Sequence, residues 1–422
     1  MNALRFFLGR LLRLGLRAVL VFPVLPVLYL IEPFFRIRIG TMYTQRIGHL
    51  AINAETFLRK MQLNGPPKRT FYLFFGWDPA NRQLFDMWKR TRGYPVRFLE
   101  SRLGTRIVFS WRSILSKTRF WEAHRITATE YTLFNHTDPV LSFTEEEENK
   151  GRRGLAEMGI GEDDWFVCFH ARDANYFRKW RPELEEHWQK VDFRNTDVLS
   201  YLKAADYITS KGGFALRYGA HVEQALPETG NPKIIDYSTT YRSDFMDIYL
   251  AAKCRFFIGS CSGPMVIPTI FNVPIVSPGH VPWNLPCYLR DDITLPMLCS
   301  VPGNSEPVSF CEAQKAGYYV GWGEASSIDQ NMDLYDMLEP EEDDILDACK
   351  DMINHLEGAP PPAGAAELQN LFAEQFYSHV PEYPEAGKVG ARFALKYRNL
   401  IVPGESGDRR PHPQSPRNVI AK

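Results

Sequence analysis

The stretch between Asp236 and Pro286 constrains the fold of this chain more than any other. After Ser243, which can cap a helix, apolar residues recur at the spacing of one helix face. An apolar run over 255–259 predicts a buried strand, and a small-residue loop over 260–264 leads into a short helix that ends near Asn272. A further strand is expected from Val273. Helices that alternate with buried strands are typical of a parallel α/β sheet, whose ligands bind at the carboxyl ends of the strands.

The composition excludes several classes of protein. The chain has 422 residues, 45% hydrophobic and 23% charged, which is enough for two domains with cores of their own. Its net charge of −1 gives no electrostatic reason to expect a nucleic acid partner. The seven cysteines include no Cys-x-x-Cys pair, so neither a zinc ribbon nor a disulfide framework is predicted. We expect the body of the protein in a reducing compartment, the cytoplasm.

Residues 1–32 differ from the rest of the chain. Four arginines punctuate an apolar first half, and 18–31 is uncharged but interrupted by two prolines. These fourteen residues are fewer than the roughly 20 that a spanning helix needs. A basic amphipathic segment suits the surface of an anionic membrane. We expect a membrane-associating segment on the cytoplasmic face of the inner membrane, with a spanning anchor or a buried core helix as alternatives.

The rest of the chain divides by pattern into several parts. A first α/β domain is expected over 33–140 and a second over 141–358, in which Thr144 and Glu147 can form a capping box. The proline- and glycine-rich region 287–330 is predicted to be loop. A linker covers 359–365, helices over about 366–377 and 387–398 lie in a segment, 366–402, expected to pack back on the body, and a disordered tail covers 403–422.

The first candidate site follows the buried strand that ends near Phe169. His170, Arg172 and Asp173 come directly after it. A fixed arginine can bind a diphosphate with two parallel hydrogen bonds, and a nearby carboxylate would orient it. The alternative is a structural Arg–Asp pair at a strand end.

The second candidate site is the loop that contains Ser260, Ser262 and Gly263. Its hydroxyls, and the backbone N–H groups at the start of the next helix, can hold a phosphate. The alternative is a tight turn between a strand and a helix with no ligand.

The third candidate site lies where the first strand of the first domain becomes a helix. Gly48 and His49 are followed there by Asn53 and Glu55. An imidazole titrates near neutral pH, so His49 is a candidate base for a sugar hydroxyl. A structural or substrate-positioning role is the alternative, and Asn53 and Glu55 are weaker candidates because both can simply face solvent.

A fourth cluster adds two basic side chains, and several motifs are missing. Arg194 and Arg217 are candidates for contacts with anionic groups of a substrate, although ordinary helix capping explains part of the polarity around 192–197. The sequence has no Asp-x-Asp, no Gly-x-Gly-x-x-Gly, no P-loop and no Gly-x-Ser-x-Gly motif. Without a metal, a diphosphate leaving group needs arginine and helix-start donors, which the first two sites supply.

Together these motifs resemble a known family. The segment 46–55, the run 170–173, the run 192–195 and the helix start that contains Asp247, followed by Ser262 and Gly263, resemble a family of bacterial glycosyltransferases associated with surface-polysaccharide synthesis. The resemblance covers about 33–400. More distantly, the His-x-Arg run and the Ser-Gly turn are similar to the GT-B fucosyltransferase superfamily. There, the arginine of His-x-Arg binds the nucleotide diphosphate, and catalysis inverts the anomeric centre without a metal.

The resemblance implies two Rossmann-like domains facing across a cleft, with the N-terminal hydrophobic segment outside them. Arg172 would hold the diphosphate and Ser260, Ser262 and Gly263 would line the nucleotide site, without a cofactor or metal. The chain departs from the superfamily in the loop 173–176, which leaves the donor base and sugar open. We expect a glycosyltransferase that uses a nucleotide sugar and a glycan or lipid-linked acceptor, with His49 as base and Asp173 as the alternative base. A nucleotide-sugar epimerase and a non-catalytic membrane-peripheral binding protein are the alternative functions.

Overall fold

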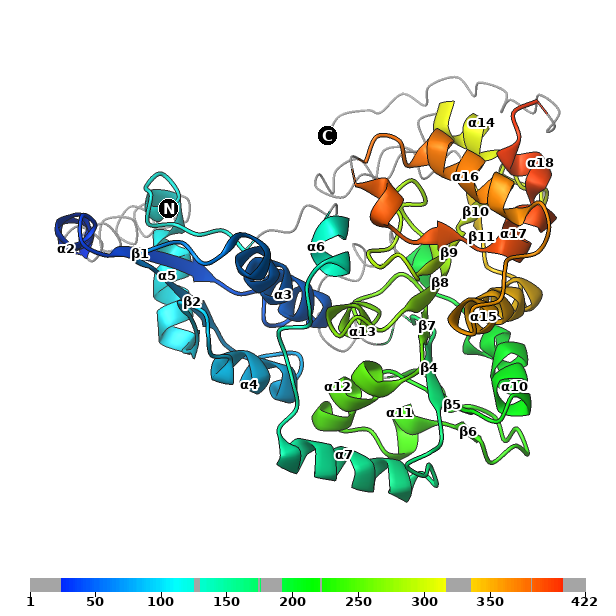
Figure 1. The fold of residues 1–422 in the computed structure, drawn as a ribbon, viewed down its shortest axis with the longest axis horizontal. Coiled ribbons are helices and arrows are strands. Elements are labelled where there is room, and N and C mark those ends of the chain that lie inside the picture. Colours follow the sequence, from blue (N-terminus) through cyan, green and yellow to red (C-terminus); the bar gives the residue numbers. More distant parts are fainter. Residues whose placement is uncertain are drawn as a thin grey trace, which may run out of the picture. The chain divides into compact units, whose positions relative to one another are not determined.

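The computed structural model describes residues 24–124, 130–173, 175, 192–220, 222–315, 335–380 and 382–404 (Figure 1). It contains two compact units, and each of them is described by itself. The first unit combines Met1–Cys168 with Thr239–Phe257 and Ser262–Val273, and the second combines Phe169–Ser238 with Ile258–Cys261 and Pro274–Lys422. The units therefore alternate along the chain, and the predicted boundaries at 140 and 358 stay a prediction.

The first unit is built on a three-stranded parallel sheet. Its strands lie in the order β1-β2-β3, as expected for strands separated by crossover helices. They are β1 (Arg36–Thr41), β2 (Thr70–Gly76) and β3 (Val96–Glu100). Alternate residues along β2, the central strand, are buried. The C-terminal end of β1 leads directly into the segment that carries His49.

Helices complete the first unit. They are α2 (Val24–Ile31), α3 (Ile47–Asn64), α4 (Arg82–Arg90), α5 (Arg102–Leu115), α6 (Tyr131–Asn135), α7 (Glu145–Glu157), α12 (Asp244–Lys253) and α13 (Val266–Ile270). Local sequence explains where several begin. Ser243 accepts a hydrogen bond from the Met246 N–H at the start of α12, and Thr144 and Glu147 form the predicted capping box at the start of α7.

The second unit is built on a seven-stranded sheet in the order β12-β9-β8-β7-β4-β5-β6 (Figure 1). Its strands are β4 (Phe166–His170), β5 (Phe214–Arg217), β6 (Ile234–Ile235), β7 (Phe257–Gly259), β8 (Ile275–His280), β9 (Ile293–Pro296) and β12 (Lys388–Val389). The pairs β5–β6, β8–β9 and β9–β12 are parallel. Strand β4 is buried along its whole length, as the continuous apolar run predicts.

The remaining elements of the second unit surround this sheet. They are η2 (Asp192–Arg194), η3 (Val198–Tyr201), α10 (Leu202–Ser210), α14 (Phe310–Lys315), α15 (Glu342–Leu356), α16 (Ala365–Phe376), η5 (Tyr383–Glu385), α17 (Ala391–Lys396), α18 (Arg398–Ile401) and a two-stranded antiparallel sheet of β10 (Leu298–Ser300) and β11 (Asp336–Leu338). The short helix α11 (Tyr237–Thr240) spans the boundary between the units.

The structure corrects two predictions of secondary structure. The region predicted as loop over 287–330 contains β9, β10 and α14, and the predicted helix over 387–398 begins as strand β12. Strand β9 pairs with β8 on one side and with β12 on the other, and the two-residue strand β12 forms through its pairing with β9. Most of the predicted membrane-associating segment, 1–23, and the tail beyond 404 lie outside the described residues. Among the helices that the structure describes, none has both the length and the apolar character that crossing a membrane would require.

Candidate functional site

The strand order of the second unit indicates where a ligand would bind. Across the sheet, the strands follow one another in the order β6, β5, β4, β7, β8, β9. In the sequence of this sheet's strands, these are the third, second, first, fourth, fifth and sixth. The order reverses between β4 and β7. In sheets of this kind ligands bind at the carboxyl ends of the two strands that flank the reversal. The residues that follow β4 and β7 are therefore the candidate ligand-binding residues.

The two strands meet through their predicted site residues. The Ser260 N–H donates to the carbonyl oxygen of His170 at 3.2 Å, and the Arg172 N–H donates to Ser260 Oγ at 2.8 Å. The Ser260 side chain thus fixes the backbone at Arg172. The structure therefore brings the first and second candidate segments together.

The guanidinium group of Arg172 is buried, and hydrogen bonds to neighbouring side chains fix its position. It donates to Asn195 Oδ1, and the Asn195 amide in turn donates to Asp192 Oδ1 at 2.9 Å. The hydrogen bond described here comes from a neutral amide, which Asp192 holds in turn, and the expectation that a carboxylate orients Arg172 directly stays a prediction. Asp173 instead accepts backbone N–H bonds from Asn175 at 2.9 Å and Glu223 at 3.1 Å, as a side chain that shapes a turn does.

Arg194 adds a second positive charge beside Arg172. Burial, together with repulsion from Arg194, lowers the pKa of Arg172 to about 10, against the opposite effect of Asp192. Within the described ranges, Arg194 Nε is buried and has no hydrogen-bond partner. Two guanidinium groups held close together in a partly dehydrated place favour an anion between them, and a diphosphate has the required charge and oxygens.

His170 and Arg217 have contacts of their own within the sheet. His170 donates from Nδ1 to the Tyr218 carbonyl oxygen at 3.0 Å, and burial lowers its pKa to about 4, so the ring is neutral at pH 7. Arg217 donates to the Gln224 carbonyl oxygen at 2.7 Å and lies 3.4 Å from Asp236. These contacts join β5 to the loop after it. That either residue binds substrate stays a prediction.

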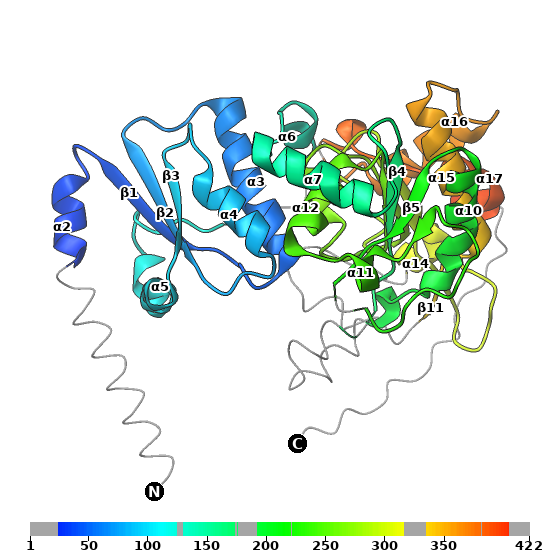
Figure 2. The same ribbon diagram turned by 90° about the horizontal axis from the view of Figure 1, so that it is seen from below.

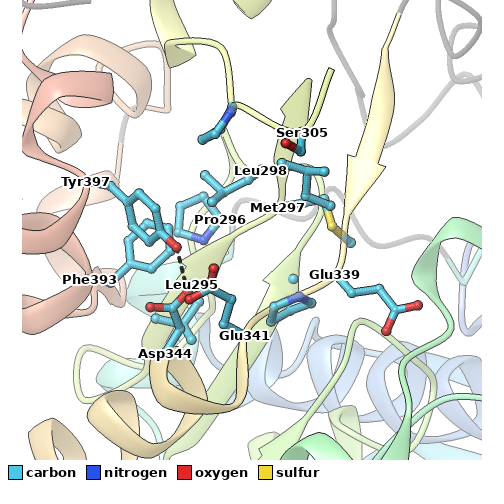
Figure 3. A pocket seen from close by; sticks show the side chains of 14 residues that line it. Leu295, Pro296, Met297, Leu298, Ser305, Glu339, Glu341, Asp344, Phe393 and Tyr397 are labelled. Atoms are coloured by element: carbon cyan, nitrogen blue, oxygen red, sulfur yellow. Dashed lines mark hydrogen bonds between the residues drawn. The ribbon is translucent and has the colours of Figure 1, made fainter. Parts of the chain in front are cut away.

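A separate cavity lies at the carboxyl ends of β8 and β9 (Figure 3). Its volume is about 100 Å³, and its polar lining includes Glu339, Glu341 and Asp344. Asp344 accepts hydrogen bonds from Tyr397 Oη at 2.8 Å and Lys396 Nζ at 2.7 Å. Its acidic lining disfavours a phosphate, so the β4–β7 edge is the better candidate for an anionic ligand. Among the described residues, no three His, Cys, Asp or Glu side chains converge as metal ligands.

The first unit carries the His49 cluster, at the start of α3. Gly48 lies there against the loop before α13, because a Cβ atom on Gly48 would stand only 3.1 Å from Gly263 Cα. The two glycines allow the backbones of these helix starts to touch. In the described structure the Ser262 hydroxyl oxygen is buried without a hydrogen-bond partner. Asp247, on α12, is buried and pairs with Arg242 at 2.8 Å, which is a structural contact.

Asn53 determines the tautomer of His49. The Asn53 amide nitrogen donates to the His124 carbonyl oxygen at 2.8 Å, which turns Asn53 Oδ1 toward His49 Nδ1 at 3.3 Å. An oxygen can only accept, so the hydrogen of the neutral ring lies on Nδ1 and the lone pair on Nε2. The hydrogen bond that the described structure gives to the His49 ring is the one at Nδ1, and Nε2 carries the lone pair that could accept a proton. Burial lowers the pKa of His49, and Arg46 adds to this.

Sequence reasoning missed the role of Glu55. Its carboxylate pairs with Arg59 Nε at 2.6 Å, and both side chains are fully buried. Arg59 also donates to the carbonyl oxygens of Thr137 at 3.1 Å and Ile270 at 2.9 Å. Glu55 is therefore part of the core and does not face solvent. The spacing of four residues on an apolar helix face was the signal for this pair.

Three solved glycosyltransferase structures are similar to this chain at low sequence identity. No protein-family model and no curated protein matches the chain. A glycosyl transferase of family 9 from Veillonella parvula is similar in structure, with a TM-score of 0.44 and 12% identity over 76% of this chain and 98% of that chain. For the E. coli ADP-heptose lipopolysaccharide heptosyltransferase II the TM-score is 0.36 and the identity 10%, over 57% of this chain and 84% of that one. An E. coli heptosyltransferase with ADP has a TM-score of 0.30 and 9% identity, over 63% and 92%. Because all three scores are below 0.5, the functional proposal below depends on the residues of this chain alone.

Proposed function

We propose that this protein is a glycosyltransferase that moves a sugar from a nucleotide-sugar donor to a glycan or lipid-linked acceptor in cell-surface polysaccharide synthesis. One observation carries the proposal. Arg172 is held by Ser260 and Asn195 at the reversal of the strand order, beside the second guanidinium group of Arg194. This is where a nucleotide would bind in such a sheet, and the two arginines suit its diphosphate. The resemblance of the sequence motifs to GT-B glycosyltransferases supports the same assignment.

The proposed reaction inverts the anomeric centre without a metal. His49 Nε2 would take the proton of the acceptor hydroxyl while the acceptor oxygen forms a bond to the anomeric carbon of the sugar. The bond from that carbon to the diphosphate oxygen breaks, and its electron pair leaves with the nucleoside diphosphate. Arg172 and Arg194 would stabilise the charge that develops on this leaving group. Asp173 is a poorer base than His49, since backbone N–H groups already hold both of its oxygens.

The proposal assigns the donor to the second unit and the acceptor base to the first. The basic, apolar residues 1–32 would hold the enzyme on the cytoplasmic face of the inner membrane, where it would meet a lipid-linked acceptor. Arg172, Arg194 and Ser260 would bind the diphosphate of the donor, and no cofactor is required. Asn53 would act as a positioning residue for His49.

Calorimetric titration of the full chain in detergent against UDP, GDP, CMP and ADP tests the proposal. We expect one nucleotide to bind, and Arg172→Lys to weaken it. Hydrogen bonds to charged groups are worth about 1.5–3 kcal/mol, so the loss should be roughly tenfold to 150-fold. Arg290→Ala is a matched control, because Arg290 is an exposed arginine of the same unit that pairs with Glu385. The proposal fails if no nucleotide binds to the folded protein, or if Arg172→Lys binds as tightly as the control.

A further inference from the structure

The most exposed apolar side chains of the described structure gather in the first unit. They are Leu30, Phe34, Leu103, Phe109 and Val27, with exposed fractions of 75%, 74%, 69%, 62% and 53%. All five lie on α2, on the turn that follows it, or on α5. Single exposed apolar residues are normal, but a gathering of this kind indicates an interaction surface.

Contacts within the first unit hold α2 beside the end of α5. The ring of Tyr29, on α2, packs edge-on against Phe120 with centroids 4.8 Å apart, and the Arg119 guanidinium lies 5.7 Å from the same ring. Phe120 follows α5 by five residues and is fully buried. Figures 1 and 2 both show α2 and α5 at the same end of the first unit. The exposed residues of α2, the turn and α5 are called the α2–α5 surface from here on.

Helix α5 carries apolar side chains on its exposed face as well as on its buried face. It buries Val108 and Leu115 and leaves Leu103 and Phe109 outside. Arg102, Arg106 and Arg112 lie exposed on the same helix. A helix that only covers a sheet would place polar residues at the outward positions that Leu103 and Phe109 occupy.

The charge of this region is strongly positive. Between residues 101 and 121 the sequence has five basic residues, namely Arg102, Arg106, Arg112, Lys117 and Arg119, and no acidic one. The whole chain, in contrast, has a net charge of −1. Arg102 lies 4.9 Å from the Trp77 ring and Arg112 lies 6.0 Å from the Trp121 ring, so aromatic rings accompany the arginines. Exposed apolar groups among arginines and aromatic rings match the interface of an anionic bilayer.

We propose that the α2–α5 surface is a membrane-binding surface of its own, which lies on an anionic bilayer and is separate from the segment 1–23. The basic N-terminal segment, which includes Arg5, Arg10, Arg13 and Arg17, directly precedes α2 in the sequence. The segment and the α2–α5 surface would therefore bind the same membrane. A second copy of the chain is a poorer occupant, because two surfaces with this many positive charges repel each other. The inference does not depend on the proposed transferase activity.

Flotation of the full chain with lipid vesicles tests this proposal. The vesicles are phosphatidylcholine, with or without phosphatidylglycerol. One positive charge near an anionic surface changes affinity about fivefold, so Arg106→Glu, a change of two charges, should weaken binding to the anionic vesicles roughly thirtyfold. Leu103→Asp with Phe109→Asp should weaken it as well. The matched control is Leu199→Asp with Leu356→Asp, which alters exposed apolar side chains of the second unit and should bind as wild type.

A second readout separates this surface from the segment 1–23. Hydroxyl-radical footprinting should show Leu103 and Phe109 protected when anionic vesicles are added, and Leu199 unchanged. The proposal is overturned if the Arg106→Glu and Leu103→Asp/Phe109→Asp variants bind like wild type, or if no protection appears on α5. It is equally overturned if light scattering shows a dimer in solution that Leu103→Asp/Phe109→Asp dissociates, since the surface would then bind a second copy.

Discussion

Replacing His124 by phenylalanine should make the first unit less sensitive to acid. His124 lies among the rings of Phe57, Phe74 and Phe98, with its centroid 3.7 Å from that of Phe74. Neither of its ring nitrogens has a hydrogen-bond partner among the described residues. Burial lowers the pKa of His124 to about 3, so the folded protein keeps this ring neutral at pH 7. Phenylalanine fits the same aromatic surroundings without a proton to gain.

The size of the effect follows from the difference between the folded and unfolded pKa. The unfolded chain takes up a proton at this histidine near pH 6.5, and the folded one only near pH 3. Between these values the unfolded state binds more protons, so stability is lost as the pH falls. One pKa unit corresponds to about 1.4 kcal/mol, and about pH 5 lies roughly 1.5 units below the unfolded value. Wild type should therefore lose about 2 kcal/mol more than His124→Phe between about pH 7.5 and about pH 5.

Native-state amide exchange of β2 measures this difference in the first unit alone, without assuming that the whole chain unfolds in one step. The comparison uses the change with pH within each protein, so that any cost of fitting a larger ring cancels. Equal pH dependence of the two proteins would refute the reasoning, because it would mean that His124 already meets solvent or a partner in the folded state.

Two further predictions concern α3. Arg59→Met should lower the free energy of unfolding of the first unit by about 3–5 kcal/mol, because it leaves the buried Glu55 carboxylate without its partner, whereas the double variant Glu55→Leu/Arg59→Met should recover part of the loss. Amide exchange of β2 measures both, and a single variant within about 1 kcal/mol of wild type would contradict the buried pair. Asn53→Leu removes the hydrogen bond that raises the pKa of His49, so that pKa should fall further. NMR titration of the His49 ring measures the change, and an unchanged or higher pKa would show that Asn53 does not hold the ring.

Elements with local signals were predictable from the sequence. Ser243 caps α12 and Thr144 caps α7 with side chains only three residues from their partners, so the sequence alone contains the interaction. The two-residue strand β12 has no such signal. It is a strand only because Lys388 and Val389 pair with Ile293 and Thr294, about 95 residues earlier in the chain. Its own residues, followed by a helix, predict helix equally well.

The candidate site was predictable in part for the same reason. Buried strands end at His170 and Gly259, and parallel sheets bind ligands at such ends, so Arg172 and Ser260 could be chosen from the sequence. Nothing in the sequence shows that β4 and β7 are neighbours in the sheet. Nor does it show that Arg172 donates a hydrogen bond to Asn195, which comes more than 20 residues later in the chain. Charge alone suggested Asp173 as that partner. In the structure, the Asp173 carboxylate accepts hydrogen bonds from two backbone N–H groups.

The alternation of the two units along the chain has a consequence for protein synthesis. The chain passes from one unit to the other five times, and the first unit takes its last residues from Ser262–Val273. One of these, Ile270, supplies a carbonyl oxygen to Arg59, 211 residues earlier. The buried guanidinium of Arg59 therefore lacks this acceptor until the ribosome has made nearly two thirds of the chain. A nascent chain that stops before residue 270 has the whole β1–β3 sheet but not its complete core, so it should depend on chaperones that shield exposed apolar surface.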